Sequence, residues 1–409
     1  MGSVRWMGPI VIRYAVREVR LENGERFPLL VSGDPVGLPV PEILEYTLAK
    51  LRARGLRRAS IRHRTEALGL ALQFLSDHRI DLVLRASDQI FLSLNELVAL
   101  ADRCRTPMGK LAASLVVGSA YAAVRYATAI DYMLWVFEPV IARISDAPAR
   151  HAANVALQRF LARSRSVSPR SRGRGSHLDG ERHGLREDQR KLFLKVIRPE
   201  DPGNPFGLKV RTRNYALLLT AFKLGTRSGE VRGLKKSDLN LDCVPTELTI
   251  LPRYHDVDDK RSDPASAKTL GRLLYVDAEL ADALERWLGD RSNRARWPRA
   301  HRNPYVFVNR YGDAMEGRGY RKIIETLRRR YPELRALCHH VLRHDWNDRW
   351  VAATEQDGVD FEKAQQEQKY AMGWSHQSDM PLRYGRQAIA SAANRRILNL
   401  QQRSENSNE

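Results

Sequence analysis

One stretch of the chain is almost free of apolar residues and divides the sequence in two. Residues 163–175 read RSRSVSPRSRGRG, and a segment so rich in Ser, Arg and Gly cannot bury a core. We therefore expect a linker over residues 163–182 with a folded part on each side. A chain of 409 residues is long enough for two or three domains that each bury a core. The other expected parts are residues 1–38, residues 39–162, residues 183–402 and a disordered tail over residues 403–409.

The charge balance points to a polyanionic partner. Lys and Arg number 68 against 48 for Asp and Glu, which gives a formal charge of +20. Such an excess favours binding to nucleic acid, because basic side chains release counterions from the phosphate backbone. No apolar run reaches the roughly 18 residues that a membrane span requires, and the N-terminus lacks the apolar stretch of a secretory signal. The sequence therefore predicts a cytoplasmic protein with no membrane partner.

The cysteines favour neither disulfides nor a metal site. Cys104, Cys243 and Cys338 are odd in number and far apart, unlike the cysteines of a disulfide framework or a zinc site. His339 and His340 lie beside Cys338, but no second Cys or His stands at ligand spacing. We expect no bound metal.

The part before the linker shows two patterns. Residues 1–38 mix short alternating stretches with Gly and Pro, which indicates an arm or a small strand pair. Apolar residues then recur at intervals of three and four, which predicts a helical domain over residues 39–162. Ser60 is the expected N-cap of one helix, and another long helix is expected between Tyr121 and Ile144. Basic residues at the Ser60 helix and in the linker face either solvent or DNA phosphates, and the candidates for phosphate contact are Arg57, Arg58, Arg62, Arg64, Arg170, Arg172 and Arg174.

The part after the linker carries four short patterns, of which the first is LGTRSGEV. Gly225 can end one helix, and Thr226 or Ser228 can cap the next one. Arg227 then lies at a helix junction, where its guanidinium can face a phosphate. Alternatively, Arg227 only braces the turn by pairing with Glu230.

The second pattern is a pair of β-rich stretches, residues 247–251 and 272–276, on either side of a long polar segment. This arrangement predicts a β-hairpin with a lysine near its tip. Lys268 directly precedes the returning strand and is preferred over Lys260. A hairpin lysine is otherwise a solubility residue, so its assignment depends on the neighbouring patterns.

The third and fourth patterns are CHHVLRH and MGW, the latter followed by a tyrosine. His340 and Arg343 are three positions apart, so on a helix they share a face and can converge on the same phosphate oxygens. Trp374 ends the MGW pattern, and Tyr384 follows it. Taken alone, His340 is a core or surface residue, and Tyr384 is a packing residue with a wet hydroxyl.

In this order the four patterns resemble the catalytic residues of the tyrosine recombinases, the phage integrase family. The resemblance implies attack by Tyr384 on a DNA phosphate, a 3′-phosphotyrosyl intermediate, and no metal or other cofactor. Trp374 stands where histidine is commoner, which is an accepted variant in this family. The catalytic residues that the resemblance implies are Arg227, Lys268, His340, Arg343, Trp374 and Tyr384, with Glu230 in support.

One departure from the family concerns spacing. Trp374 and Tyr384 are ten positions apart (384 − 374 = 10), one more than the family leads us to expect, and Pro381 lies between them. His376 is an alternative to Trp374, but the preceding Met-Gly pair sets the register on Trp374. Tyr370 precedes the MGW pattern, which is the wrong order for the nucleophile.

The resemblance also implies a fold, a function and an assembly. We expect a mainly α catalytic domain with a small β-sheet (α+β), an N-terminal helical SAM-like core-binding domain, and a two-domain clamp on DNA. The expected function is site-specific recombination for integration, excision or transposition of a mobile element, with double-stranded DNA recombination sites as partners. A type IB topoisomerase-like nicking-closing enzyme and a non-catalytic DNA-binding regulator on the same fold are the alternatives.

The residues after Tyr384 carry an apolar stripe. Ile389, Ala393, Ile397 and Leu400 fall at intervals of four, four and three, which predicts one apolar face of a helix. This face either packs on its own domain or passes to a neighbouring subunit. The habit of the family favours the second, which implies a tetramer on DNA joined by the C-terminal helix.

Overall fold

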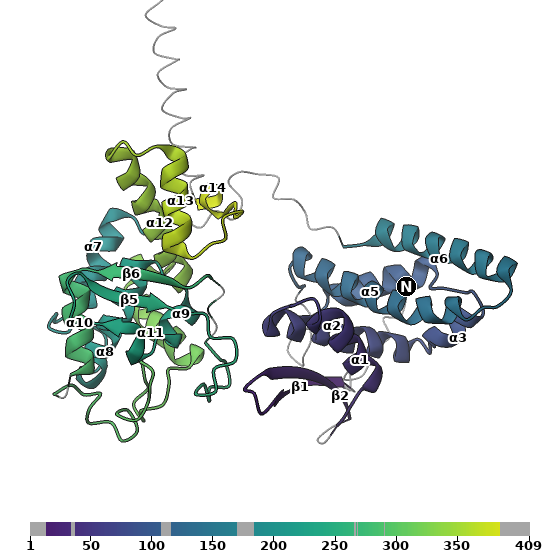
Figure 1. Ribbon diagram of the computed structural model, residues 1–409, viewed down its shortest axis with the longest axis horizontal. Helices are drawn as coiled ribbons and strands as arrows, with labels where there is room; N and C mark the ends of the chain where they lie inside the picture. The colour runs from purple at the N-terminus through teal and green to yellow at the C-terminus, as the bar shows by residue number, and fades with distance from the viewer. Residues whose placement is uncertain are drawn as a thin grey trace, which may run out of the picture. The chain divides into compact units, whose positions relative to one another are not determined.

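The computed structural model divides the chain into two compact units, Met1–Asp179 and Gly180–Glu409 (Figure 1). The residues that the structure describes are 14–33, 37–107, 116–169, 184–265, 267, 269–289 and 291–384.

The first unit starts with a small antiparallel sheet. Strands β1 (Tyr14–Arg20) and β2 (Arg26–Ser32) pair along their whole length, and the short β3 (Leu38–Pro39) pairs with β2. Leu30 of β2 packs on Gly69, where an added Cβ would lie 2.9 Å from a Leu30 methyl carbon. The missing side chain of this glycine therefore lets the sheet sit close to a helix.

Helices make up the rest of the first unit. The sheet packs on α2, α2 packs on α5, and α4 and α6 pack on α5 and on each other. Leu68, Met133 and Phe137 are fully buried in this core, and burying one such side chain stabilises the fold by about 1.5–3 kcal/mol. The elements are α1 (Pro41–Tyr46), the π-helical turn η1 (Thr47–Arg52), α2 (Arg58–Asp77), α3 (Leu82–Ser87), α4 (Leu94–Arg105), α5 (Ser119–Ala142) and α6 (Ala147–Val167).

The start of α2 differs from the prediction. Ser60 lies inside the helix, and the N-cap is Arg57, whose backbone is extended and whose side chain makes no capping bond. Arg58 forms an ion pair with Glu18 of β1. This contact from a distant part of the chain stabilises the first turn, so the Ser60 prediction, which used local preference alone, was wrong.

The second unit is mainly helical with one small sheet, which confirms the predicted fold class. Its sheet has the order β4 (Leu239–Asn240), β5 (Thr246–Ile250) and β6 (Arg272–Val276), all antiparallel. The expected β-hairpin is thus present, with its first strand one residue earlier than predicted. The helices are α7 (Glu187–Val196), α8 (Leu208–Leu224), α9 (Ser228–Gly233), α10 (Ala278–Leu288), α11 (Gly317–Arg330), α12 (His339–Gln356), α13 (Phe361–Met372) and α14 (Met380–Tyr384), with short 3₁₀ turns η2 (Lys236–Asp238) and η3 (Pro332–Leu334).

Helix α8 is the central element of the second unit. It contacts α10 and α12, and its apolar residues from Ala216 to Phe222 are buried. The helix ends at Gly225, whose φ of 56° is in the left-handed region. A Cβ at Gly225 would lie 2.7 Å from the Trp346 ring, so the turn after α8 lies directly against α12. No described helix is both long and apolar enough to cross a bilayer.

Candidate active site

The turn between α8 and α9 holds the first candidate arginine. Arg227 is the residue before α9, and its backbone N–H donates to the Glu230 carboxylate at 2.8 Å. Neither Thr226 nor Ser228 is the N-cap, in contrast to the prediction, because Glu230 reaches back to the backbone of Arg227. The Arg227 side chain is 26% exposed, and one of its terminal nitrogens lies 3.7 Å from Glu230. The guanidinium is thus held near a helix N-terminus, which suits binding of an anion.

Glu230 forms its shorter ion pair with an arginine that the sequence patterns did not single out. Arg272, the first residue of β6, donates to the Glu230 carboxylate at 3.0 Å, and both side chains are almost fully buried. Thr269 donates to the other carboxylate oxygen at 2.5 Å. Burial alone would raise the pKa of the Glu230 carboxyl, but the charge of Arg272 and the hydrogen bonds hold this pKa below its usual value. Glu230 is therefore an anion that ties Arg227 to the hairpin.

Arg272 also connects the hairpin to the MGW pattern. Its Nε donates to the Ala371 carbonyl at 2.7 Å, and the backbone N–H of Leu270 donates to the Gly373 carbonyl at 2.9 Å. Gly373 ends α13 with a φ of 63°, and a Cβ there would lie 2.7 Å from an Arg272 nitrogen. Three of the four sequence patterns meet at this one buried arginine.

Arg343 of α12 contacts both the turn before α9 and the end of α13. Its side chain is 1% exposed, and its terminal nitrogens donate to the carbonyls of Gly225 at 2.6 Å and of Met372 at 3.3 Å. Its guanidinium carbon lies 5.5 Å from the centre of the buried Trp374 ring. The structure therefore brings Arg343, Trp374 and the turn that carries Arg227 together.

The two adjacent histidines have different surroundings. His340 is exposed at the start of α12, whereas the ring of His339 binds the Thr226 carbonyl and the Tyr320 hydroxyl, each at 2.6 Å. A neutral ring satisfies both contacts, with Nε2–H donating to Thr226 and Nδ1 accepting from Tyr320. Burial lowers the pKa of His339 to about 4, and the positive charge of Arg343 adds to this effect. His339 thus braces the Arg227 turn, while His340, the residue that the sequence selected, faces outward.

Two candidates lie at the limits of the described residues. Lys268 is outside them, although Ala267 and Thr269 on either side are described and buried. Tyr384 is the last residue of α14, which contacts α12 and α13, and its side chain is outside the described residues. Tyr370 is exposed, and its hydroxyl donates to the Leu273 carbonyl at 3.2 Å.

The candidate DNA-binding arginines of the first unit lie on α2 and at its start. Arg57 and Arg62 are exposed, and Arg62 pairs with Glu66 at 3.1 Å. Arg58 pairs with Glu18, as described above, and Arg64 donates to Thr128 at 3.2 Å. The linker candidates are outside the described residues, and these are Arg170, Arg172 and Arg174.

A mainly helical unit thus places Arg272, Arg343, Trp374 and the turn that carries Arg227 together beside one hairpin. Residues 185–388 match the model of the phage integrase family, and the chain belongs to this family.

Curated relatives match only part of the chain. The tyrosine recombinase XerD of Listeria innocua is 26% identical over 152 residues, which is 37% of this chain and 44% of the relative. The XerD protein of Listeria monocytogenes is 25% identical over the same length. The chain thus spans less than half the length of the curated relatives that it matches.

Solved structures of two kinds match the chain at low sequence identity. The Tn1549 transposon integrase in complex with transposon right end DNA is 15% identical, with a TM-score of 0.48, and the match covers 85% of this chain and 99% of that one. The XerA recombinase is 16% identical, with a TM-score of 0.34, and the match covers 84% and 96%.

Proposed function

We propose that this protein is a site-specific DNA recombinase that cleaves and rejoins strands through a 3′-phosphotyrosyl intermediate. The observation that carries the proposal is the meeting of Arg343 from α12 with the turn that carries Arg227. Arg343 donates to the carbonyl of Gly225, two positions before Arg227. Two arginines from distant parts of the chain are thus held at one turn, and we infer that they serve one phosphate, as charge stabilisation of a phosphoryl transfer requires.

In the proposed reaction, the phenolic oxygen of Tyr384 forms a bond to the scissile phosphorus while the bond from phosphorus to the 5′ oxygen breaks. The tyrosine proton must leave during attack, because the pKa of a free tyrosine is about 10. Arg227 and Arg343 neutralise the charge of the pentacoordinate phosphorane. The phosphotyrosyl ester conserves the bond energy, so a 5′-hydroxyl from another strand can reverse the step without metal or ATP.

The remaining residues have supporting roles in this proposal. Lys268 protonates the departing 5′ oxygen, and His340 donates to a phosphate oxygen or assists proton movement. Trp374 packs beside Arg343, and its indole N–H is a donor that does not titrate. Glu230 orients Arg227.

The same proposal assigns the partners. Double-stranded recombination sites bind the exposed arginines of α2 and of the linker, with the two units acting as a clamp, because an excess of positive charge favours the phosphate backbone. Four subunits assemble on paired sites through the C-terminal helix. The protein acts in the cytoplasm and serves integration, excision or transposition of a mobile element.

Covalent trapping tests this function without knowledge of the target sequence. Purified protein is incubated with sheared host DNA, protein–DNA adducts are recovered under denaturing conditions, and the attached fragments are sequenced. Wild-type protein should yield adducts at a defined sequence, and Tyr384→Phe should bind that sequence with nearly unchanged affinity but form no adduct. Tyr370→Phe is the matched control, because it removes the hydroxyl of a neighbouring exposed tyrosine, and it should trap like wild type. Adducts from Tyr384→Phe would move the nucleophile elsewhere, and sequence-specific binding without wild-type adducts would favour the non-catalytic regulator.

A further inference from the structure

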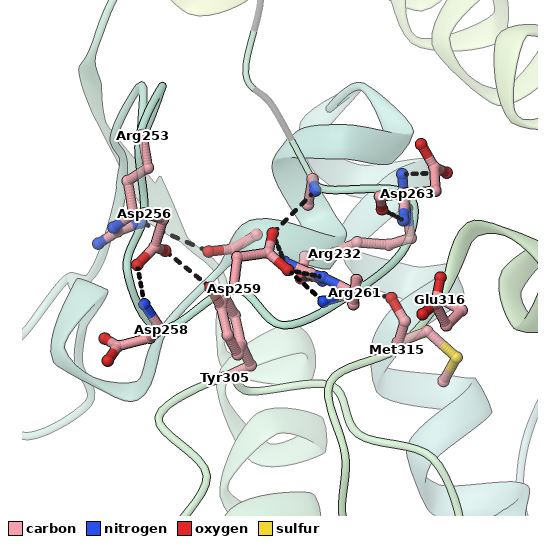
Figure 2. A network of polar contacts seen from close by, with 12 residues as sticks. Arg232, Arg253, Asp256, Asp258, Asp259, Arg261, Asp263, Tyr305, Met315 and Glu316 are labelled. Carbon is pink, nitrogen blue, oxygen red and sulfur yellow. Dashed lines mark hydrogen bonds and ion pairs between the residues drawn. The ribbon is translucent and has the colours of Figure 1, made fainter. Parts of the chain in front are cut away.

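The segment between β5 and β6, residues 251–271, is held by a network of ion pairs (Figure 2). Connections longer than about 12–15 residues without helix or strand are uncommon and often functional. Lys235, next to η2, binds Asp256 at 2.9 Å and Asp258 at 2.7 Å, and Tyr305 donates to Asp256 at 2.7 Å. These contacts attach one half of the segment to the body of the unit.

The other half is centred on a buried pair, Asp259 and Arg261, which are 3% and 4% exposed. Arg261 binds both carboxylate oxygens of Asp259, at 2.8 and 2.7 Å. Its third nitrogen donates to the carbonyl of Arg232 in α9 at 2.7 Å, and its guanidinium lies 4.4 Å from the centre of the Tyr305 ring. The pair therefore fixes the segment to the helix whose N-cap is Arg227.

Asp259 continues this connection toward the hairpin lysine. Its carboxylate accepts the backbone N–H of Ala265 at 3.1 Å, three positions before Lys268. On the other side of Lys268, Thr269 donates to Glu230 at 2.5 Å. Both flanks of the lysine are thus anchored on carboxylates, and each carboxylate is held in turn by a buried arginine, Arg261 or Arg272.

We propose that the Asp259–Arg261 pair is a positioning element for leaving-group protonation by Lys268, an inference that rests on the proposed recombinase function. A general acid must lie within about 3 Å of the atom that it protonates, and a displacement of about 1 Å can cost 100-fold in rate. The pair attaches the segment to α9, the helix whose N-cap is Arg227, and it also binds Ala265, three positions before Lys268.

The chemistry of the step supplies a selective readout. When the bond from phosphorus to the 5′ oxygen breaks, its electron pair stays on oxygen, which takes a proton from the Lys268 ammonium and leaves a neutral amine. A sulfur atom in that bridging position departs as a thiolate and needs no proton. A defect in proton delivery therefore disappears on the sulfur substrate, whereas a general structural defect persists on both.

The test compares cleavage of nicked duplexes that carry oxygen or sulfur at the bridging position, with the sequence taken from the trapped wild-type adducts. Arg261→Lys keeps a positive charge but loses the forked contact with Asp259 and the bond to Arg232. We expect its cleavage of the oxygen substrate to fall at least tenfold and its cleavage of the sulfur substrate to stay within threefold of wild type. Lys268→Ala should show the same pattern.

Arg253→Lys is the matched control. Arg253 also forms a forked pair, with Asp238, in the same segment, but it makes no hydrogen bond or ion pair with the described residues 265, 267 and 269. This variant should stay within threefold of wild type on both substrates. Asp259→Asn is the second test variant, for use if Arg261→Lys folds poorly. It keeps the side-chain volume while removing the charge that holds Arg261, and it should show the same selective loss on the oxygen substrate.

Equal losses on the oxygen and sulfur substrates would overturn the positioning role, and so would full activity of both test variants on oxygen. Failure of the wild-type protein to form a Tyr384-dependent adduct would instead overturn the proposed function itself.

Discussion

Arg227 lies in the turn between α8 and α9, and Arg343 donates to that turn, but the two side chains should contribute differently to stability. Arg227 is 26% exposed with a loose contact to Glu230 at 3.7 Å, whereas Arg343 is buried and donates to two backbone carbonyls. A buried carbonyl that loses its donor costs about 1–3 kcal/mol. The two arginines should therefore separate catalysis from stability.

Replacing each arginine by alanine tests this separation. Arg227→Ala should lose about 3 kcal/mol or more of transition-state stabilisation, or at least 100-fold in cleavage rate, by analogy with removal of one oxyanion donor, with little change in unfolding free energy. Arg343→Ala should lose as much rate and also be destabilised by about 2 kcal/mol or more, because the buried carbonyls of Gly225 and Met372 both lose their donor. Single-turnover cleavage and urea unfolding measure the two effects, with the exposed Arg286→Ala as the control. A rate loss below threefold in Arg227→Ala would mean that Arg227 only stabilises the turn by pairing with Glu230.

His339 should make the second unit sensitive to acid. Burial lowers its pKa to about 4 in the folded protein, against about 6.5 in the unfolded chain. The unfolded chain therefore takes up a proton first, so stability is intact above about pH 6.5 and falls as the pH drops toward 4, by at most about 3 kcal/mol. Urea unfolding followed by tryptophan fluorescence at pH 7.5 and pH 5 should show a smaller loss in His339→Gln than in wild type. The same pH dependence in both proteins would assign the acid sensitivity to other groups.

The sequence identified some residues of the site and missed others for a physical reason. Arg343 and Trp374 could be selected because each belongs to a short local pattern. Arg272 could not, because its partner Glu230 is 42 positions away and only the folded sheet brings them together. His339 and His340 are adjacent, and no local pattern tells which of them is buried against the Arg227 turn.

At the scale of elements, periodicity predicted the main helices and the hairpin, but the helix starts were less readable. Two expected N-caps were wrong. Helix α2 begins before Ser60, where Arg58 pairs with Glu18. Helix α9 begins at neither Thr226 nor Ser228 as the N-cap, because the Glu230 carboxylate accepts the backbone N–H of Arg227. Both depend on carboxylates that lie outside the capping position. The ion-pair network of residues 251–271 also could not be predicted from the sequence, because charged residues in a polar segment show no periodic pattern.

Gly358 and Gly373, which follow α12 and α13, both have a left-handed backbone but differ in surroundings, and this difference gives an element-scale prediction. Gly373 has a φ of 63°, and an added Cβ would lie 2.8 Å from Thr269 and 2.9 Å from the Leu270 carbonyl. Gly358 has a φ of 66° with nothing within 4 Å. Gly358→Ala should cost only the left-handed strain of about 1–2 kcal/mol, while Gly373→Ala should add the displacement of the hairpin, with typical overpacking costs of about 1–3 kcal/mol.

The activity of these two variants should differ more than their stability. Displacing the hairpin from α13 moves the residues on both sides of Lys268, so Gly373→Ala should cleave at least tenfold more slowly than Gly358→Ala under conditions where both are folded. Thermal melting and single-turnover cleavage measure the pair. Equal cleavage rates would mean that the contact between Gly373 and the hairpin serves stability alone.

At the scale of the whole molecule, the sequence predicted two folded parts, and the structure has two compact units. If the proposed function holds, exchange of strands between two sites requires four active sites, and we expect each chain to supply one. The apolar stripe of Ile389, Ala393, Ile397 and Leu400, which lies outside the described residues, is the candidate for joining subunits. A cyclic, head-to-tail exchange of such a helix closes a ring without leaving an unpaired surface.

We therefore predict monomers in free solution that become tetramers on paired sites, and a chain ending at Gly385 that binds one site but forms no synaptic complex. The loss follows because the apolar face that would enter the neighbouring subunit is removed, whereas the candidate DNA-binding arginines stay. Gel shifts with two differently labelled sites measure synapsis, and sedimentation measures the free protein. Ile389→Ser combined with Ile397→Ser should repeat the defect in the full chain, while Asn394→Ala combined with Gln401→Ala, off the stripe, should not. Normal synapsis by the truncated chain would show that the stripe packs on its own domain.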